Sequence, residues 1–286
     1  MKNIQKERCH NYADLKNNGK LIKGKALLIS SLLFMCSSCS FHAPKSNTPE
    51  CDSLNLAQWE NYPVGNILFE DKAPESQGSK IYKRIIDDPQ NYIKEQAHTV
   101  LATLYSSKQD SIAPVYNLHY TLENVEGVSA KGGENGNIYI YYSTQHIERS
   151  FANNDTTKLF FETRGVLLHE LTHAYQLEPQ GIGDYMSSEV FRAFIEGMAD
   201  AVRAANNGFT PSDRPKGGSY MNGYRYGGFF YLWIAKNKDA DFLKKFNRST
   251  LEIIPWSFNE AIQYALGPEY NIDTLWNEYQ KAMGDI

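Results

Sequence analysis

The amino-acid sequence predicts an α+β fold, in which an N-terminal helix and a small mixed sheet precede a mainly helical C-terminal part. Three observations predict it. Apolar residues repeat at helical spacing after residue 88, two segments between residues 116 and 142 have strand patterns, and helical patterns dominate from residue 155 onward. The composition is that of a globular protein, because 42% of the 286 residues are hydrophobic and 22% are charged.

Residues 1–39 are predicted to be a signal peptide. Lysines precede an apolar run over residues 26–35, which is too short to span a bilayer and has the shape of a signal-peptide core. The end of the run resembles a bacterial lipoprotein signal, in which a cysteine after small residues is lipidated and becomes the mature N-terminus. Cys39 follows two serines and fits that pattern better than Cys36. We therefore expect an exported lipoprotein that Cys39 anchors to a bacterial membrane, in the periplasm, in the outer membrane or at the cell surface.

Residues 40–77 are predicted to be a tether, and residues 78–286 one folded domain. Prolines recur through the tether, although its middle has enough apolar residues to pack on the domain. No cysteine follows Cys51, so neither disulfides nor cysteine-ligated zinc are expected in the domain. The net charge of −4 gives no indication of a nucleic-acid surface, and we expect no nucleic-acid partner.

The N-terminal helix and the sheet come first in the domain. Asp88 and Pro89 mark the helix start, because a capping residue followed by proline at the first helical position is typical of one. Residues 116–122 alternate between apolar and polar, which predicts a half-buried strand. Residues 137–142 are apolar or aromatic on both faces, as in the middle of a sheet, and a further strand is expected around residues 128–131.

The helical part begins near Asp155. Its second helix is expected from about residue 187 to Gly208, and two more helical patterns cover residues 257–266 and 272–283.

The first of these helices contains the motif H-E-x-x-H, formed by His169, Glu170 and His173. Residues four apart lie on the same face of an α-helix. The two histidines can therefore offer imidazole nitrogens to one tetrahedral zinc, with Glu170 beside them as a general base. The alternative is a helix with two ordinary buried or surface histidines, because such a motif also arises by chance.

A catalytic zinc needs a third protein ligand and keeps its fourth position for water. A continuation as G-x-x-H is excluded, because Gln176 and Pro179 occupy those positions. The next helix supplies E-x-x-x-D instead, in which Glu196 would bind the metal and Asp200 would accept the free N–H of a ligand histidine. In the alternative Glu196 is a solvated residue, but its neighbours are apolar, and an unpaired carboxylate among them is costly.

Four motifs in order resemble the basic secretory protein family, a group of plant and bacterial proteins regarded as zinc peptidases. They are the segment 169–176, the segment 195–200, Gly223-Tyr224 before an aromatic helix, and a tryptophan–tyrosine pair in 275–279. The resemblance implies a zincin-like, gluzincin-type peptidase fold with the zinc site given above. The segment after Tyr224 departs from the plant pattern, and this chain is acidic where plant members are basic. Their defence role is therefore not carried over.

The expected function is a lipid-anchored zinc metallopeptidase that acts on a protein or peptide substrate. Glu170 would take a proton from the attacking water and deliver it to the leaving amine. Tyr224 is the first candidate to stabilise the oxyanion and Tyr226 the second, although both also fit an aromatic packing role. The substrate would lie along the sheet edge near residues 128–131. Two alternatives stay open, namely a surface binding protein with a structural or vestigial zinc site and a zinc hydrolase of non-peptide amides.

Overall fold

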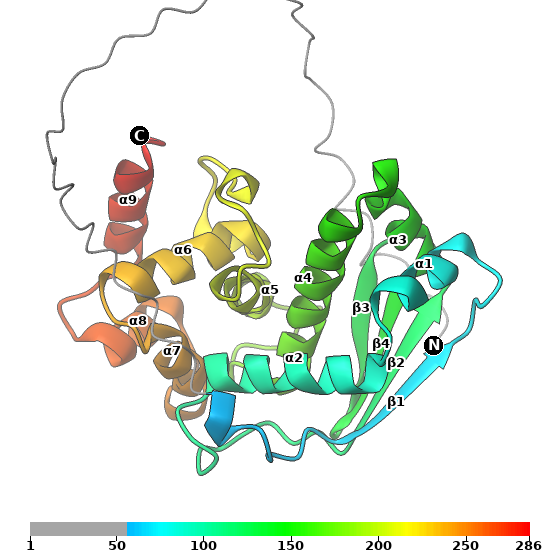
Figure 1. Ribbon diagram of the computed structural model, residues 1–286. Coiled ribbons are helices and arrows are strands. Elements are labelled where there is room, and N and C mark those ends of the chain that lie inside the picture. The colour runs from blue at the N-terminus through cyan, green and yellow to red at the C-terminus, as the bar shows by residue number, and fades with distance from the viewer. Residues whose placement is uncertain (1–55) are drawn as a thin grey trace, which may run out of the picture.

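The computed structural model of the chain describes residues 56–286 and shows the predicted α+β architecture (Figure 1). A small mixed sheet and its neighbouring helices form one side of the molecule, and the C-terminal helices form the other. The predicted signal peptide, its lipidation site at Cys39 and the first part of the tether lie outside the described residues. Within the described range, no helix is long and apolar enough to cross a membrane.

The sheet in the described part of the chain has four strands in the order β1-β2-β4-β3. β1 runs parallel to β2 and β2 parallel to β4, whereas β3 runs antiparallel to β4 and forms an edge. The strands predicted from the sequence are confirmed, and β4 takes the interior position that its two apolar faces require. The bounds are β1 (Asn66–Asp71), β2 (Asn117–Glu123), β3 (Ser129–Glu134) and β4 (Asn137–Ser143).

The folded domain begins earlier than the sequence predicted. Strand β1 lies within residues 40–77, which were expected to form the tether, and it pairs with β2 along its whole length. Before it, Trp59 is fully buried and its ring contacts those of Tyr62 and Tyr105. The described part of the predicted tether is therefore a component of the domain.

The helices that precede the H-E-x-x-H helix lie on the sheet side of the molecule: α1 (Gln77–Ile85), α2 (Pro89–Leu104) and α3 (Thr144–Ser150). α2 begins where the sequence predicts, because the Asp88 side chain accepts a hydrogen bond from the backbone N–H of Asn91 at 3.1 Å. α2 also contacts the helix that carries the H-E-x-x-H motif, so it links the sheet side to the site.

The two motif helices are α4 (Thr156–Tyr175) and α5 (Glu189–Ala205). Both begin at capping residues, Asp155 and Ser188, whose side chains accept a backbone N–H of the first turn. α4 contacts β3 on one side and α5 on the other. The site residues on these helices therefore face the free edge of the sheet.

Helix α6 (Tyr224–Asn237) packs along α5 at unusually close range. A Cβ atom at Gly228 would lie 2.7 Å from the Cβ of Asp200, and one at Gly227 would lie 3.1 Å from the Cα of Gly197. Glycines at these positions let the two helices approach, and this brings the first residue of α6 to the site.

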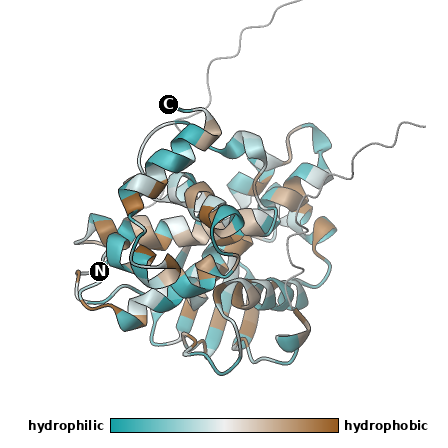
Figure 2. Ribbon diagram, turned by 90° about the vertical axis from the view of Figure 1, so that its left-hand side faces the viewer, coloured by the Kyte–Doolittle hydropathy of each residue, from teal (hydrophilic) through white to brown (hydrophobic). Residues whose placement is uncertain are grey.

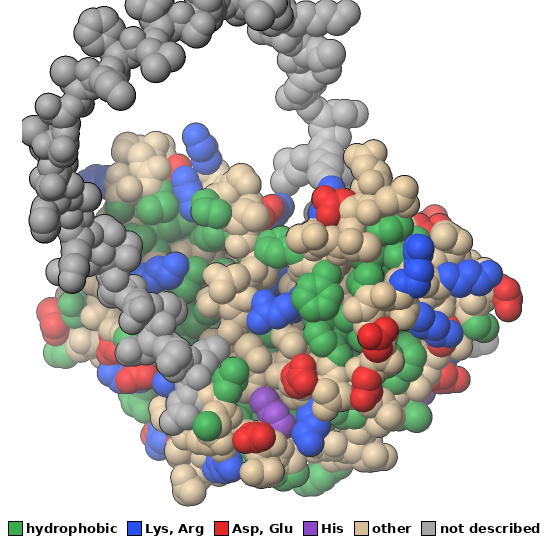
Figure 3. All heavy atoms as spheres, in the orientation of Figure 1, with side chains coloured by type: hydrophobic (Ala, Val, Ile, Leu, Met, Phe, Trp, Pro, Cys, Tyr) green, Lys and Arg blue, Asp and Glu red, His purple; other side chains and the backbone are tan. Residues whose placement is uncertain are grey.

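The remaining helices are α7 (Phe242–Glu252), α8 (Phe258–Leu266) and α9 (Ile272–Met283), which confirm the last two helical patterns. Aromatic contacts such as Phe230 with Trp276 join them to α6. Many helices combine hydrophilic and hydrophobic residues (Figure 2), as expected for helices with one buried face. Acidic and basic side chains are interspersed over the face that Figure 3 shows.

Candidate metal centre

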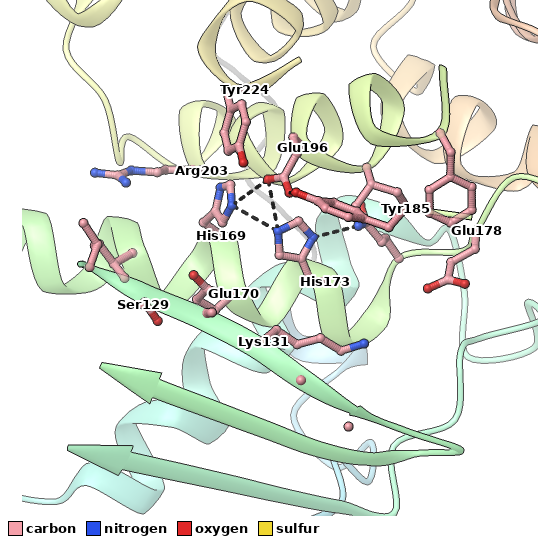
Figure 4. Close-up of a pocket in the computed structure, with 18 residues that line it drawn as sticks. Ser129, Lys131, His169, Glu170, His173, Glu178, Tyr185, Glu196, Arg203 and Tyr224 are labelled. Atoms are coloured by element: carbon pink, nitrogen blue, oxygen red, sulfur yellow. Dashed lines mark hydrogen bonds and ion pairs between the residues drawn. The ribbon is translucent and has the colours of Figure 1, made fainter. Parts of the chain in front are cut away.

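Three side chains from α4 and α5 converge on one point (Figure 4). The Nε2 atoms of His169 and His173 are 3.1 Å apart. The Oε2 atom of Glu196 lies 3.3 Å from the first and 3.4 Å from the second. The structure thus brings together the three residues that the sequence selects as metal ligands.

The spacing and chemistry of these atoms fit a zinc ion. Ligand atoms in a tetrahedral zinc site, with bonds of about 2.0–2.1 Å, lie about 3.3–3.4 Å from one another. The three observed distances, from 3.1 to 3.4 Å, are close to that value. Two imidazole nitrogens and one carboxylate oxygen are also the donor set of many catalytic zinc sites, and they leave a fourth position open.

Asp200 holds the first histidine, as expected from the sequence. Its Oδ1 atom lies 2.7 Å from Nδ1 of His169, and its side chain is only 1% exposed. Nδ1 therefore carries the proton that it donates to Asp200, and Nε2 keeps its lone pair for a metal. Asp200 faces Gly228 of α6, so the packing of α6 fixes the position of this carboxylate.

Gln176 holds the second histidine, which the sequence interpretation missed. Its amide Nε2 lies 2.9 Å from Nδ1 of His173, while its Oε1 is buried without a hydrogen-bond partner among the described residues. Turning the amide by 180° exchanges the two nearly isosteric atoms. Oε1 then accepts the Nδ1–H of His173, and Nε2 of that histidine faces the metal position without a proton. Gln176 is the C-cap of α4, so its side chain is placed one turn from His173.

Tyr185 holds the third ligand and was also missed. Its hydroxyl donates a hydrogen bond of 2.6 Å to Oε1 of Glu196, the oxygen that does not face the histidines. Tyr185 lies in the loop between α4 and α5. No periodic pattern marks a loop residue, so the only sequence signal is an aromatic residue close to the ligand helix.

Glu170 lies beside the ligands but outside their convergence point. It is 6% exposed and lines the same cleft. Burial raises the pKa of Glu170, whereas His169 and His173 act in the opposite direction. A carboxylate with a raised pKa accepts a proton more readily than an exposed one, which suits a general base.

Tyr224 is placed in the cleft, and Tyr226 is not. The ring of Tyr224 stacks on that of His169 at 6.2 Å, and its hydroxyl points toward the ligands (Figure 4). Burial, with Glu196 second, raises the pKa of Tyr224, so its hydroxyl keeps the proton and remains a donor. Its backbone φ of 42° is uncommon for a non-glycine residue. Tyr226 instead packs against Gly218 and does not line the cleft.

The cleft around these residues has a volume of about 350 Å³. Residues 128–133 of β3 and its approach form one side, which we call the strand wall. The lining residues of α4 and α5, together with Tyr224, form the other, which we call the helical wall. The strand wall is an open sheet edge, and its partner strand β4 lies on the side away from the cleft.

A second cluster of charged groups lies at one end of the helical wall. Glu162 accepts from Arg203 at 2.9 Å and lies 3.1 Å from His146. Burial opposes ionisation of Glu162, but His146 and Arg203 outweigh it and lower the pKa of Glu162 to about 2. The cluster is paired within itself, and it has no ligand atom in the metal triad.

Residues 65–279 match a family model described as "peptidase of plants and bacteria". No curated protein matches the chain, and no solved structure does. The match covers both walls of the cleft and every residue placed in it above.

Proposed function

The chain belongs to this family of peptidases of plants and bacteria, in agreement with the motifs of its sequence, and on that premise we propose that it is a zinc metallopeptidase. The observation that carries the proposal is the convergence of two Nε2 atoms and one carboxylate oxygen beside the buried Glu170, in a cleft with an open sheet edge.

His169, His173 and Glu196 would hold the zinc, with Asp200 and Gln176 fixing the two imidazole tautomers. When bound, zinc supplies a Lewis acid that polarises a carbonyl oxygen and makes water acidic near neutral pH. The ligand side chains are between 8% and 14% exposed, so the surrounding protein restricts their movement and shields them from most solvent.

Glu170 is the proposed general base. Its carboxylate takes the proton of the attacking water and returns it to the leaving amine. Its burial and its raised pKa support this role, since both make proton uptake by the carboxylate easier.

Tyr224 is the proposed donor to the oxyanion that develops on the scissile carbonyl. One such donor contributes about 3 kcal/mol in typical enzymes. The stacking on His169 and the direction of the hydroxyl support Tyr224 over Tyr226.

The substrate is proposed to be an extended peptide that pairs with the strand wall. In the antiparallel β3–β4 pair, the N–H of Ser143 bonds to the C=O of Val128, its directly opposite partner. Because bonded and non-bonded pairs alternate, the backbone groups of Ser129, the residue after Val128, point away from β4. They can therefore receive the backbone of an added strand.

We further propose that the chain is exported and lipid-anchored at Cys39. The support is the apolar run followed by Ser-Ser-Cys in the sequence. Loss of fatty-acid labelling in Cys39→Ser, with labelling retained in Cys36→Ser, is the expected result, and the reverse pattern would assign the anchor to Cys36.

The decisive experiment compares wild type with Glu170→Gln, which keeps the side-chain volume and removes the base. Metal analysis should find one zinc per chain in both proteins. Cleavage of a peptide library should fall by about 10²–10⁴ in the variant. Equal cleavage by the two proteins would refute the mechanism. Zinc binding without cleavage by either protein would favour a binding protein with a structural zinc.

A further inference from the structure

The carboxylate of Glu196 uses its two oxygens differently. Oε2 faces both histidine Nε2 atoms, at 3.3 and 3.4 Å, whereas Oε1 accepts the hydroxyl of Tyr185 at 2.6 Å. A carboxylate can bind a metal through one oxygen or through both. A hydrogen bond on Oε1 favours the first mode, because that oxygen is already engaged and turned away from the histidines.

The mode of binding decides whether the site is open. Two histidines and one carboxylate oxygen fill three positions of a tetrahedral zinc and leave the fourth for water or substrate. A second oxygen of Glu196 would compete for that fourth position. The geometry around Oε1 therefore bears directly on whether the centre can catalyse.

The loop that carries Tyr185 is fixed to the helix that carries Glu196. The backbone carbonyl of Tyr185 accepts a hydrogen bond of 2.9 Å from Arg192, which lies one turn before Glu196 on α5. Next to it, the carboxylate of Asp184 accepts the backbone N–H groups of Met186 at 3.0 Å and Ser187 at 2.9 Å. These contacts, none of which involves a metal ligand atom, position the tyrosine hydroxyl opposite the carboxylate of Glu196.

We propose that Tyr185 is a positioning residue that holds Glu196 as a one-oxygen ligand and so keeps a coordination position open. The inference rests on the proposed zinc site and assigns a role to a residue outside the H-E-x-x-H and E-x-x-x-D motifs. Tyr185 acts through Glu196, so its effect is visible on the metal itself without any substrate.

The test uses the full-length protein loaded with Co²⁺, whose visible spectrum reports the ligands and geometry of the site. Tyr185→Phe removes one oxygen atom from a half-buried side chain. We expect a changed cobalt spectrum and a titration with azide, a small anion that binds open metal positions, that is about 10–100-fold weaker than in wild type. Competition with a chromophoric chelator measures the zinc affinity of the same variant.

Tyr226→Phe is the matched control, because it makes the same chemical change on a tyrosine that does not line the cleft. It should reproduce the wild-type spectrum and azide titration. Tyr185→Phe with a wild-type spectrum and wild-type azide binding overturns the inference, whatever its zinc affinity. An equal change in the control overturns it as well.

A second measurement needs no variant. X-ray absorption at the zinc edge of the wild-type protein separates one-oxygen from two-oxygen carboxylate binding by the distance to the carboxylate carbon. One oxygen from Glu196 is expected, and two would overturn the inference even if Tyr185→Phe did not fold.

Failure of this inference is distinguishable from failure of the proposed function. If the wild-type protein binds Co²⁺ and azide as expected but cleaves no peptide, the proposed peptidase activity is refuted and the role of Tyr185 is not. If the wild type cleaves peptides and Tyr185→Phe has a wild-type cobalt spectrum and azide titration, only the proposed role of Tyr185 is refuted. Wild-type protein that binds no metal would overturn both.

Discussion

The helical wall and the strand wall of the cleft are built in opposite ways. On the helical wall, His169, His173 and Glu196 are nearly buried, and each has a partner for the polar atom that does not face the metal position. On the strand wall, residues of β3 are half-buried or exposed, and its outward backbone groups face the cleft. Bond cleavage needs side chains held to a fraction of an ångström, whereas recognition of varied peptides needs groups that every peptide can meet.

The largest effect should follow from breaking the helical wall at its third ligand. Glu196→Ala leaves two histidines, so we expect loss of stoichiometric zinc and of all measurable cleavage. Zinc should also no longer raise the melting temperature, because metal binding and folding are linked. Metal analysis and thermal melts with and without zinc measure this. Full zinc occupancy in Glu196→Ala would contradict the ligand assignment.

A smaller effect should follow from removing the oxyanion donor. Tyr224→Phe should lower kcat by about 10²–10³ and leave zinc affinity near that of wild type. Tyr226→Phe serves as the control and should keep wild-type kcat. The same loss in both variants would mean that the hydroxyl of Tyr224 has no special role.

Removal of the Asp200 carboxylate, which lies behind His169, should have a smaller effect than removal of the oxyanion donor. Asp200→Ala should weaken zinc binding by about 10–100-fold, because the Nδ1–H of His169 loses its acceptor. Competition with a zinc chelator measures the affinity. A wild-type affinity would show that Asp200 serves only the packing of α5 against α6.

The amide behind His173 offers a sharper comparison through two substitutions. Gln176→Glu keeps an acceptor for the Nδ1–H of His173 and should bind zinc about as well as wild type. Gln176→Leu keeps the side-chain bulk without an acceptor and should weaken zinc binding by about 10-fold. This is the lower end of the range for residues that hydrogen-bond to metal ligands, because the amide is neutral. The opposite ranking in a chelator competition would show that the amide donates to His173.

The smallest effects are expected from the strand wall. They are tested by changing the backbone of the substrate, because the proposed contacts on this wall are backbone hydrogen bonds. Replacing single peptide bonds of a cleaved peptide by esters removes one N–H at a time. Because a docked strand pairs through alternate residues, kcat/KM should fall at every second position, by about 2–10-fold for a bond worth 0.5–1.5 kcal/mol. Losses of equal size at successive positions would exclude strand pairing.

The sequence predicted the helical wall better than the strand wall. His169 and His173 are one turn apart on one helix, so their relative position follows from helix geometry alone. Glu196 and Asp200 follow the same rule on a second helix. The sheet was predicted in part, since the patterns of β2 and β4 are clear, but β1 was assigned to the tether because prolines surround it.

Gln176 and Tyr185 could not be predicted for a different reason. Each acts on a ligand through a contact that depends on how a helix end or a loop folds back on the site. Such contacts leave no repeating pattern in the sequence from which they could be predicted. Their roles follow from the structure, which shows the partners of the ligand atoms that do not face the metal position.

The open edge of β3 has a consequence for what the protein can attack. A chain segment can pair with that edge only if it is extended and has its own backbone groups unpaired along one side. Folded proteins satisfy those groups internally and expose few such segments. The proposed peptidase would therefore select its targets by conformation before sequence, cutting unfolded chains and loose termini and sparing the same segments inside a native sheet or helix.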